Sequence, residues 1–298
     1  MKAAWQKNKI IPTDSPATAE EIEADIDNNP ASSAAAEENI KSLNAAGNKT
    51  QKPDYKLLPQ SSDYDFDDVE EITWDGLKGI LDAEGLSNKM DFDKFNLVGL
   101  RNKISTKKNF PNRFTDVVFI MGPEKDKSLE YYPATTVPGP FFLVKSFRNY
   151  YVATGAKGAV NPKGLAIVQP GVYKFKIGMH RGQYEALVQS GNIKVQRYSP
   201  IDDPAKATFN TYSPGNEEIG NSSINIHRGL RSGSTPTVDS HSSGCIVLKN
   251  SSDLREILAD MKKINQSEID FALVQIDNIP AKVLALASDE NSKKEKTA

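Results

Sequence analysis

One short segment of the 298-residue chain brings together the residue types that nucleophilic catalysis needs. Residues 224–250 contain the chain's only cysteine, Cys245, and two of its three histidines, His227 and His241. A thiol becomes a strong nucleophile when a neighbouring imidazole takes its proton. Gly244 permits a tight backbone and close substrate approach, and the N–H groups of Gly244 and Cys245 are suited to stabilising an oxyanion. The segment therefore predicts acyl transfer through a cysteine.

The same segment resembles the active-site motif of the L,D-transpeptidase (YkuD-like) family. In that family a histidine is followed by a spacer and then by Ser/Thr-His-Gly-Cys at the head of a strand. Here a spacer of similar length, fourteen residues, separates His227 from Ser242. Ser242 matches the Ser/Thr position, Gly244 matches the glycine and Cys245 matches the cysteine. The resemblance implies that Cys245 is the nucleophile and that His227 is the general base.

Two positions depart from the family pattern. Ser243 stands where the family has its second histidine, and Val247 stands where it has Arg or Asn. We count Ser243 with Gly244 among the predicted catalytic positions because this part of the motif shapes the oxyanion hole. The chain is most similar to divergent Ser-x-Gly-Cys members, which include phage-encoded proteins and interbacterial effectors. The resemblance covers about residues 93–278.

Polar residues around the motif are candidates for substrate binding. Arg228 and Arg231 suit a carboxylate because a guanidinium forms bidentate hydrogen bonds, although both arginines could equally be solvated. His241, four residues before Cys245, either replaces the histidine lost at Ser243 or is a plain loop residue. The predicted substrate-binding set is completed by Gly229, Ser242 and His180.

Three other interpretations stay open from the sequence. A lone cysteine is often a small buried hydrophobic residue without chemistry. The three histidines and Cys245 are plausible zinc ligands, although their spacing matches no zinc signature. The chain could also be a catalytically inactive cell-wall-binding or structural module of a virion or injection system on the same fold.

The resemblance implies a reaction on the stem peptides of peptidoglycan. Cys245 attacks a peptide carbonyl next to a D-amino acid or meso-diaminopimelate, and a thioester forms. An amine then resolves it in transpeptidation, or water resolves it in L,D-carboxypeptidase or endopeptidase cleavage. The resemblance implies no metal and no organic cofactor.

The elements that must position these residues are mainly β-strands. Short apolar runs separated by Pro, Gly and Asn are typical of an antiparallel β domain. Apolar periodicity predicts a helix over residues 75–84 and another after Cys245, capped by Ser251 or Ser252. We expect a mainly β fold of the L,D-transpeptidase (YkuD-like) type with a few helices. The predicted strands are 95–101, 116–121, 129–135, 165–168, 171–179, 186–189, 193–197, 224–228, 245–248 and 271–277.

Composition divides the chain into four parts. Residues 1–72 are predicted to be a disordered acidic leader, because they offer little apolar area to offset the entropy of ordering. Residues 1–70 carry fourteen Asp and Glu against seven Lys, which leaves the rest of the chain with a net charge of +5. The other parts are a short helical connector at 73–92, the catalytic domain at 93–280 and a frayed tail at 281–298.

Charge and hydropathy limit the partners. The overall charge of −2 gives no basic field for nucleic acid, and no apolar run approaches the roughly 18 residues of a membrane span. The first residues lack the apolar stretch of a secretory signal. We therefore expect synthesis in the cytoplasm and delivery to the cell wall in the periplasm, or association with a virion or injection particle. Residues 1–72 would dock the protein on a phage tail or contractile injection system.

Overall fold

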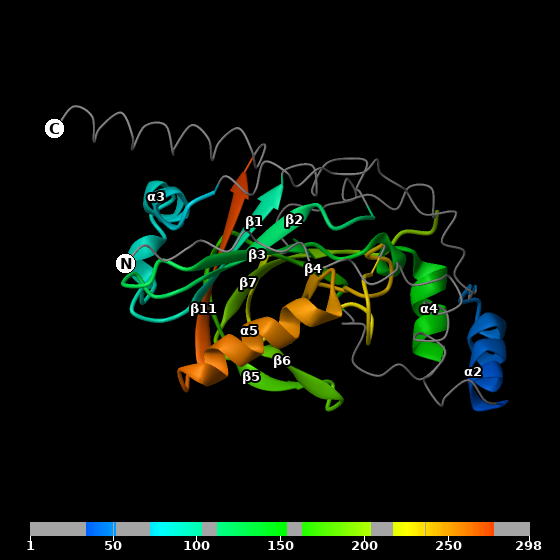
Figure 1. Cartoon of the computed structure of the whole chain (residues 1–298). Coiled ribbons are helices and arrows are strands. Elements are labelled where there is room, and N and C mark those ends of the chain that lie inside the picture. Colours follow the sequence, from blue (N-terminus) through cyan, green and yellow to red (C-terminus); the bar gives the residue numbers. More distant parts are fainter. Residues whose placement is uncertain are drawn as a thin grey trace, which may run out of the picture.

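The computed structural model describes residues 34–49, 51, 72–102, 112–153, 163–203, 217–235 and 237–276. These residues form a closed eight-stranded barrel, a separate three-stranded sheet and four α-helices (Figure 1). The prediction of a mainly β protein with a few helices is confirmed at this level. Most of the predicted leader and the whole of the predicted tail lie outside the described residues.

Strand order defines the barrel and shows one difference from the expected antiparallel domain. Two of the barrel pairings are parallel, β1 with β11 and β9 with β10, so the sheet is mixed. The barrel strands in spatial order are β1 (Asn96–Asn102), β11 (Glu268–Ile276), β5 (Gly171–His180), β6 (Tyr184–Gln189), β9 (Asn225–Arg228), β10 (Ile246–Leu248), β3 (Leu129–Thr135) and β2 (Asp116–Met121). The small sheet contains β4 (Leu165–Val168), β7 (Ile193–Tyr198) and β8 (Glu217–Gly220).

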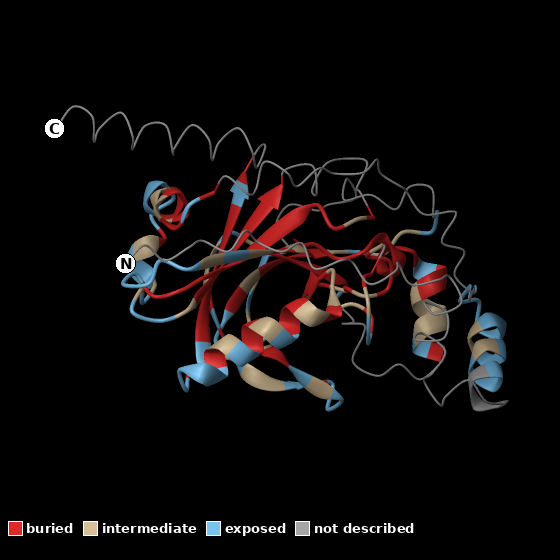
Figure 2. Ribbon diagram, viewed as in Figure 1, coloured by how far each residue is buried: buried red, intermediate tan, exposed pale blue. Residues whose placement is uncertain are grey.

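The helices lie around this β core. The α-helices are α2 (Ala34–Ala45), α3 (Trp74–Ala83), α4 (Lys145–Ala153) and α5 (Ser251–Lys263), and two 3₁₀ turns are η3 (Ser87–Lys89) and η5 (Pro140–Leu143). Helix α5 directs its apolar stripe into the main core, and Figure 2 shows buried residues on its barrel side. Its N-cap is Asn250, one residue before the first of the two predicted caps, Ser251. None of the helices in the described ranges has the length and apolar character needed to cross a membrane.

Strands β1, β2 and β11 are buried on both faces, which explains their nearly continuous apolar sequences. Leu97 of β1 faces the main core, whereas Val98 contacts a second cluster outside the barrel. The second cluster is completed by α3, whose Leu77, Ile80 and Leu81 have no exposed surface. Residues 74–83, predicted as part of a connector, therefore belong to the barrel domain.

The structure adds elements that the sequence patterns did not predict. Within the predicted disordered leader, residues 34–45 form α2, whose sequence consists largely of good helix formers such as Ala, Glu, Lys and Leu. The Asn39 side chain lies 3.5 Å from the Ala153 carbonyl of α4. This part of the predicted leader is therefore helical in the structure. Helix α4 and strand β8 were also not expected.

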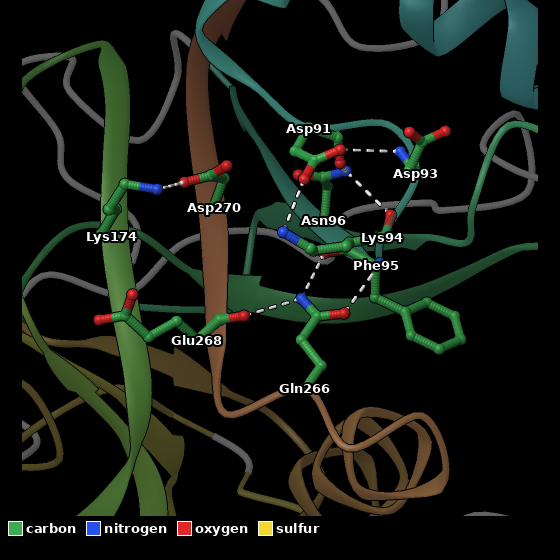
Figure 3. A network of polar contacts seen from close by, with 9 residues as sticks. All are labelled: Asp91, Asp93, Lys94, Phe95, Asn96, Lys174, Gln266, Glu268 and Asp270. Atoms are coloured by element: carbon green, nitrogen blue, oxygen red, sulfur yellow. Dashed lines mark hydrogen bonds and ion pairs between the residues drawn. The ribbon is translucent and has the colours of Figure 1, made fainter.

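A polar network joins the starts of the parallel strands β1 and β11 (Figure 3). The side chain of Gln266 accepts a hydrogen bond from the Phe95 N–H at 3.0 Å and donates to the Phe95 and Glu268 carbonyls, both at 2.8 Å. Lys174 of β5 pairs with Asp270 of β11 at 2.8 Å. Since β1 and β11 come from distant parts of the chain, the buried Gln266 amide holds a long-range pairing in register.

Gln266→Ala is expected to lower the free energy of unfolding by about 1–3 kcal/mol, because it leaves buried backbone groups without partners. Urea denaturation of the purified variant measures this change. Gln275→Ala is the matched control, since Gln275 is exposed on the same strand β11 and its loss should stay within about 0.5 kcal/mol. Equal stability of the two variants would contradict the assigned role of the Gln266 amide.

Candidate active site

The parallel pair β9 and β10 places the predicted nucleophile and base on one face. Ile246 pairs with Ile226, and both side chains lie in the main core. Because successive side chains of a strand point to opposite faces, Cys245, Asn225 and His227 all lie on the face opposite that core. Strand spacing puts the Cα atoms of Cys245 and His227 about 8 Å apart on the diagonal. The two predicted residues therefore share one face of the sheet, with Cys245 immediately before β10 and His227 on β9.

Cys245 is half-buried just before β10, with its sulfur surrounded by backbone groups. The Asn225 N–H donates to Sγ at 3.4 Å, and the thiol faces the Ser223 carbonyl at 3.9 Å. Burial raises the pKa of the Cys245 thiol, while the Asn225 N–H and the positive charge of Arg181 act in the opposite direction. The group at rest near neutral pH is therefore a thiol, which needs a base to become a nucleophile.

His227 is buried and held as a neutral base. Its Nδ1 lies 2.6 Å from the Arg228 carbonyl, which can only accept, so we assign the proton to Nδ1 and the basic lone pair to Nε2. Burial holds the pKa of His227 well below 6.5, and the charges of His180, Arg181 and His241 act in the same direction. A neutral imidazole with a basic Nε2 is the form that can take a thiol proton.

The residues just before the cysteine form a tight turn. The Ser242 hydroxyl accepts from the Gly244 N–H at 3.1 Å and donates to the Cys245 carbonyl at 2.7 Å. Gly244 has a φ of +151°, and a Cβ there would lie 2.9 Å from the Cβ of Ala166. Only glycine fits this position, as the sequence indicated.

Two expectations about this turn need correction. Ser242 is only 1% exposed and its hydroxyl is used inside the turn, so it shapes the backbone instead of contacting substrate as predicted. The Gly244 N–H is occupied by Ser242 and is not available to an oxyanion. Within the described ranges, the Cys245 N–H has no acceptor, so it is the backbone donor that remains. Ser243 is half-buried, and its carbonyl accepts from the Ala166 N–H at 3.2 Å.

The loop between the two predicted catalytic residues is anchored from a distant segment. The Asn112 side chain accepts from the Asp239 N–H at 2.8 Å and donates to the Asp239 carboxylate. Phe114, Val238 and Val247 form a small buried cluster beside it. Val247, which replaces the polar residue of the family motif, thus packs the loop against β10.

The predicted substrate-binding residues lie in different surroundings. Arg228 stacks its guanidinium 4.2 Å from the centre of the Tyr184 ring and donates to the Leu230 carbonyl at 2.5 Å. Arg231 is exposed on the loop. His241 is half-buried, and its charge lowers the pKa of His227. A Cβ at Gly229 would collide with the Thr235 side chain, so close packing explains this glycine. His180 is buried beside His227.

Sequence reasoning missed two residues that the structure places at this site. Asn225 contacts the thiol through its backbone and His180 through its side chain. Arg181 is exposed in the turn between β5 and β6, and its charge acts on the pKa of both Cys245 and His227. The repeated tripeptide His-Arg-Gly, at residues 180–182 and 227–229, was the available signal for this hairpin.

The structure is that of a mainly β protein in which Cys245, immediately before β10, and His227 on β9 share one face of a parallel strand pair. In the described part of the chain, no group of three or more His, Cys, Asp or Glu residues is placed to hold a metal ion. Comparisons with protein-family models, with curated proteins and with solved structures find no match to the chain.

Proposed function

We propose that this protein is a cysteine acyltransferase or peptidase of the L,D-transpeptidase (YkuD-like) type that acts on peptidoglycan stem peptides. The observation that supports the proposal is the position of Cys245 immediately before β10, on the strand neighbouring β9 and its His227. The motif resemblance supports the family and the substrate, and the neutral, Nδ1-protonated His227 supports the chemistry.

The proposed reaction begins when His227 Nε2 takes the thiol proton and Cys245 Sγ bonds to the carbonyl carbon of the substrate. The Cys245 N–H donates to the oxyanion that forms. The carbon–nitrogen bond then breaks, and His227 returns the proton to the leaving amine. Water or a second amine attacks the resulting thioester and gives its proton to His227, and the sulfur leaves and is reprotonated. Water yields hydrolysis, and an amine yields transpeptidation.

Digestion of purified sacculi with wild-type protein and with Cys245→Ala tests the function directly. We expect stem-peptide species that appear or disappear only with wild type, read as muropeptide masses. Products whose summed mass exceeds that of the parent muropeptide by one water identify hydrolysis, and a new cross-link identifies transpeptidation. Identical profiles from both proteins, across several wall chemotypes, would overturn the enzyme proposal. Binding of both proteins to sacculi would then favour an inactive cell-wall-binding module.

A further inference from the structure

His180 is the side chain most closely packed against the predicted base. The two imidazole rings stack with their centroids 4.2 Å apart and their planes 30° apart. His180 ends β5 and is 6% exposed, while His227 lies on β9. Strand β6 separates the two strands, so the contact depends on the barrel fold and not on sequence proximity.

A second contact connects His180 to the nucleophile. The Asn225 side-chain amide lies 2.9 Å from His180 Nδ1, and because the amide nitrogen can only donate, Nδ1 is the acceptor. The backbone N–H of the same Asn225 donates to Cys245 Sγ. His227, His180, Asn225 and Cys245 are thus linked in one continuous series of contacts.

We propose that His180 is a positioning residue, which fixes the ring plane of His227, the proposed base for the Cys245 thiol. The hydrogen bond from Nδ1 to the Arg228 carbonyl holds one atom of the ring and leaves rotation about that contact. A ring stacked on the imidazole face removes this freedom. Residues that contact a functional histidine and fix its orientation commonly determine how efficiently it acts.

The charge state of His180 suits this role. Burial, followed by the positive charges of Arg181 and Arg228, lowers the pKa of His180 to about 4. His180 therefore stays neutral at working pH and does not repel the imidazolium that His227 becomes during the reaction. The charges of Arg181 and His241 act on the pKa of His227, and that of His180 acts only at the low pH where His180 is protonated. The Tyr184 hydroxyl lies 3.4 Å from His227 Nδ1.

Titration of the imidazole protons by NMR tests the packing without any substrate. The chain has three histidines, so single variants assign the signals. In His180→Ala the pKa of His227 should rise by about one unit or more toward 6.5, because water reaches its exposed face. His180→Phe keeps a ring there and should hold that pKa low, whereas His180→Gln offers Asn225 an acceptor but no ring and should let it rise. Gln183→Ala, at an exposed position in the same hairpin, is the control.

Two results would overturn the proposal: an unchanged His227 titration in a natively folded His180→Ala protein, or the same titration in His180→Phe and His180→Gln. The comparison of His180→Phe with His180→Gln also tests the role of His180 if the His180→Ala protein does not fold.

Turnover gives the second readout, and this one rests on the proposed function. On stem peptides, His180→Ala should lower kcat by about 10–100-fold with little change in KM, because the base is misplaced while substrate contacts remain. His180→Phe should recover most of kcat, and His180→Gln should not. If His180→Ala raised KM and left kcat unchanged, the result would contradict a positioning role and favour direct substrate binding by His180. If the wild type shows no turnover, the proposed function fails, while the NMR titration still decides the role of His180.

Discussion

His227→Ala is expected to lower kcat on peptidoglycan stem peptides by about 10²–10⁴-fold, the usual contribution of a general base. The reason is the state of the thiol. Burial raises the pKa of Cys245, so very little thiolate exists near neutral pH and the reaction depends on proton removal by a neighbour. His227 is the neutral base on the same face of the sheet. Steady-state kinetics on purified stem peptides measure the loss.

The pH dependence of the proposed activity follows from the same pair. His227 must be neutral to accept the proton, and its folded-state pKa lies well below 6.5 because it is buried. Activity should therefore persist as the pH falls through 6.5 and decline only when the pH reaches that lowered pKa. A wild-type profile that loses half its kcat/KM at pH 6.5 or above would contradict this.

Two controls separate the base from general damage to the fold. Circular dichroism should show the same barrel in His227→Ala as in the wild type. At high pH, where hydroxide removes the thiol proton, the gap between the variant and the wild type should narrow. A variant that keeps more than a tenth of wild-type kcat at pH 7 would exclude His227 as the general base.

Many of the β-strands could be predicted because the pattern of apolar residues that marks each strand lies within one short segment. The runs that became β1 and β2 have apolar residues at neighbouring positions, and the structure shows why: Leu97 and Val98 face different clusters, and so do Val117 and Val118. The tight turn at Gly244 was also predictable from the glycine itself. The structure shows the reason for the glycine, because the backbone conformation and the nearby Ala166 admit no side chain.

What could not be predicted depends on contacts between distant segments. The parallel pairing of β1 with β11 joins residues more than 170 positions apart, and it leaves no periodic signal in either strand. His180 and Asn225 likewise meet across 45 positions. Helix α4 has the sequence KSFRNYYVA, in which aromatic and β-branched residues favour a strand, and the packing of Phe147 against Phe141 decides in favour of the helix.

A buried charge network gives the largest expected effect on stability. Arg101 is 1% exposed and donates to the Thr136 hydroxyl and carbonyl, both at 2.7 Å, and to the Val168 carbonyl at 2.8 Å. Asp116, also buried, accepts from the Asn102 N–H at 2.9 Å and from the Thr136 hydroxyl at 2.6 Å. Burial lowers the pKa of Arg101 to about 10 and the charge of Asp116 opposes this, so Arg101 stays charged at neutral pH.

Arg101→Met is therefore expected to lower the free energy of unfolding by about 3–5 kcal/mol, because it removes one partner of a buried charge pair. Urea denaturation measures the loss. Arg255→Met, at an exposed position on α5, is the control and should change the stability by no more than about 0.5 kcal/mol. A loss below about 1 kcal/mol in Arg101→Met would show that the network is not an important source of stability.

The double variant Arg101→Met with Asp116→Asn identifies the cause of that loss. If the cost arises from an Asp116 carboxylate left without its counter-charge, Asp116→Asn should cost less in the Arg101→Met background than in the wild type. If the cost arises from the unsatisfied Val168 and Thr136 carbonyls, the two losses should simply add. The distinction reaches the active site, because Val168 ends β4, the strand whose Ala166 N–H holds the Ser243 carbonyl just before Cys245. Loosening β4 should therefore also lower turnover in Arg101→Met under conditions where the variant is still fully folded.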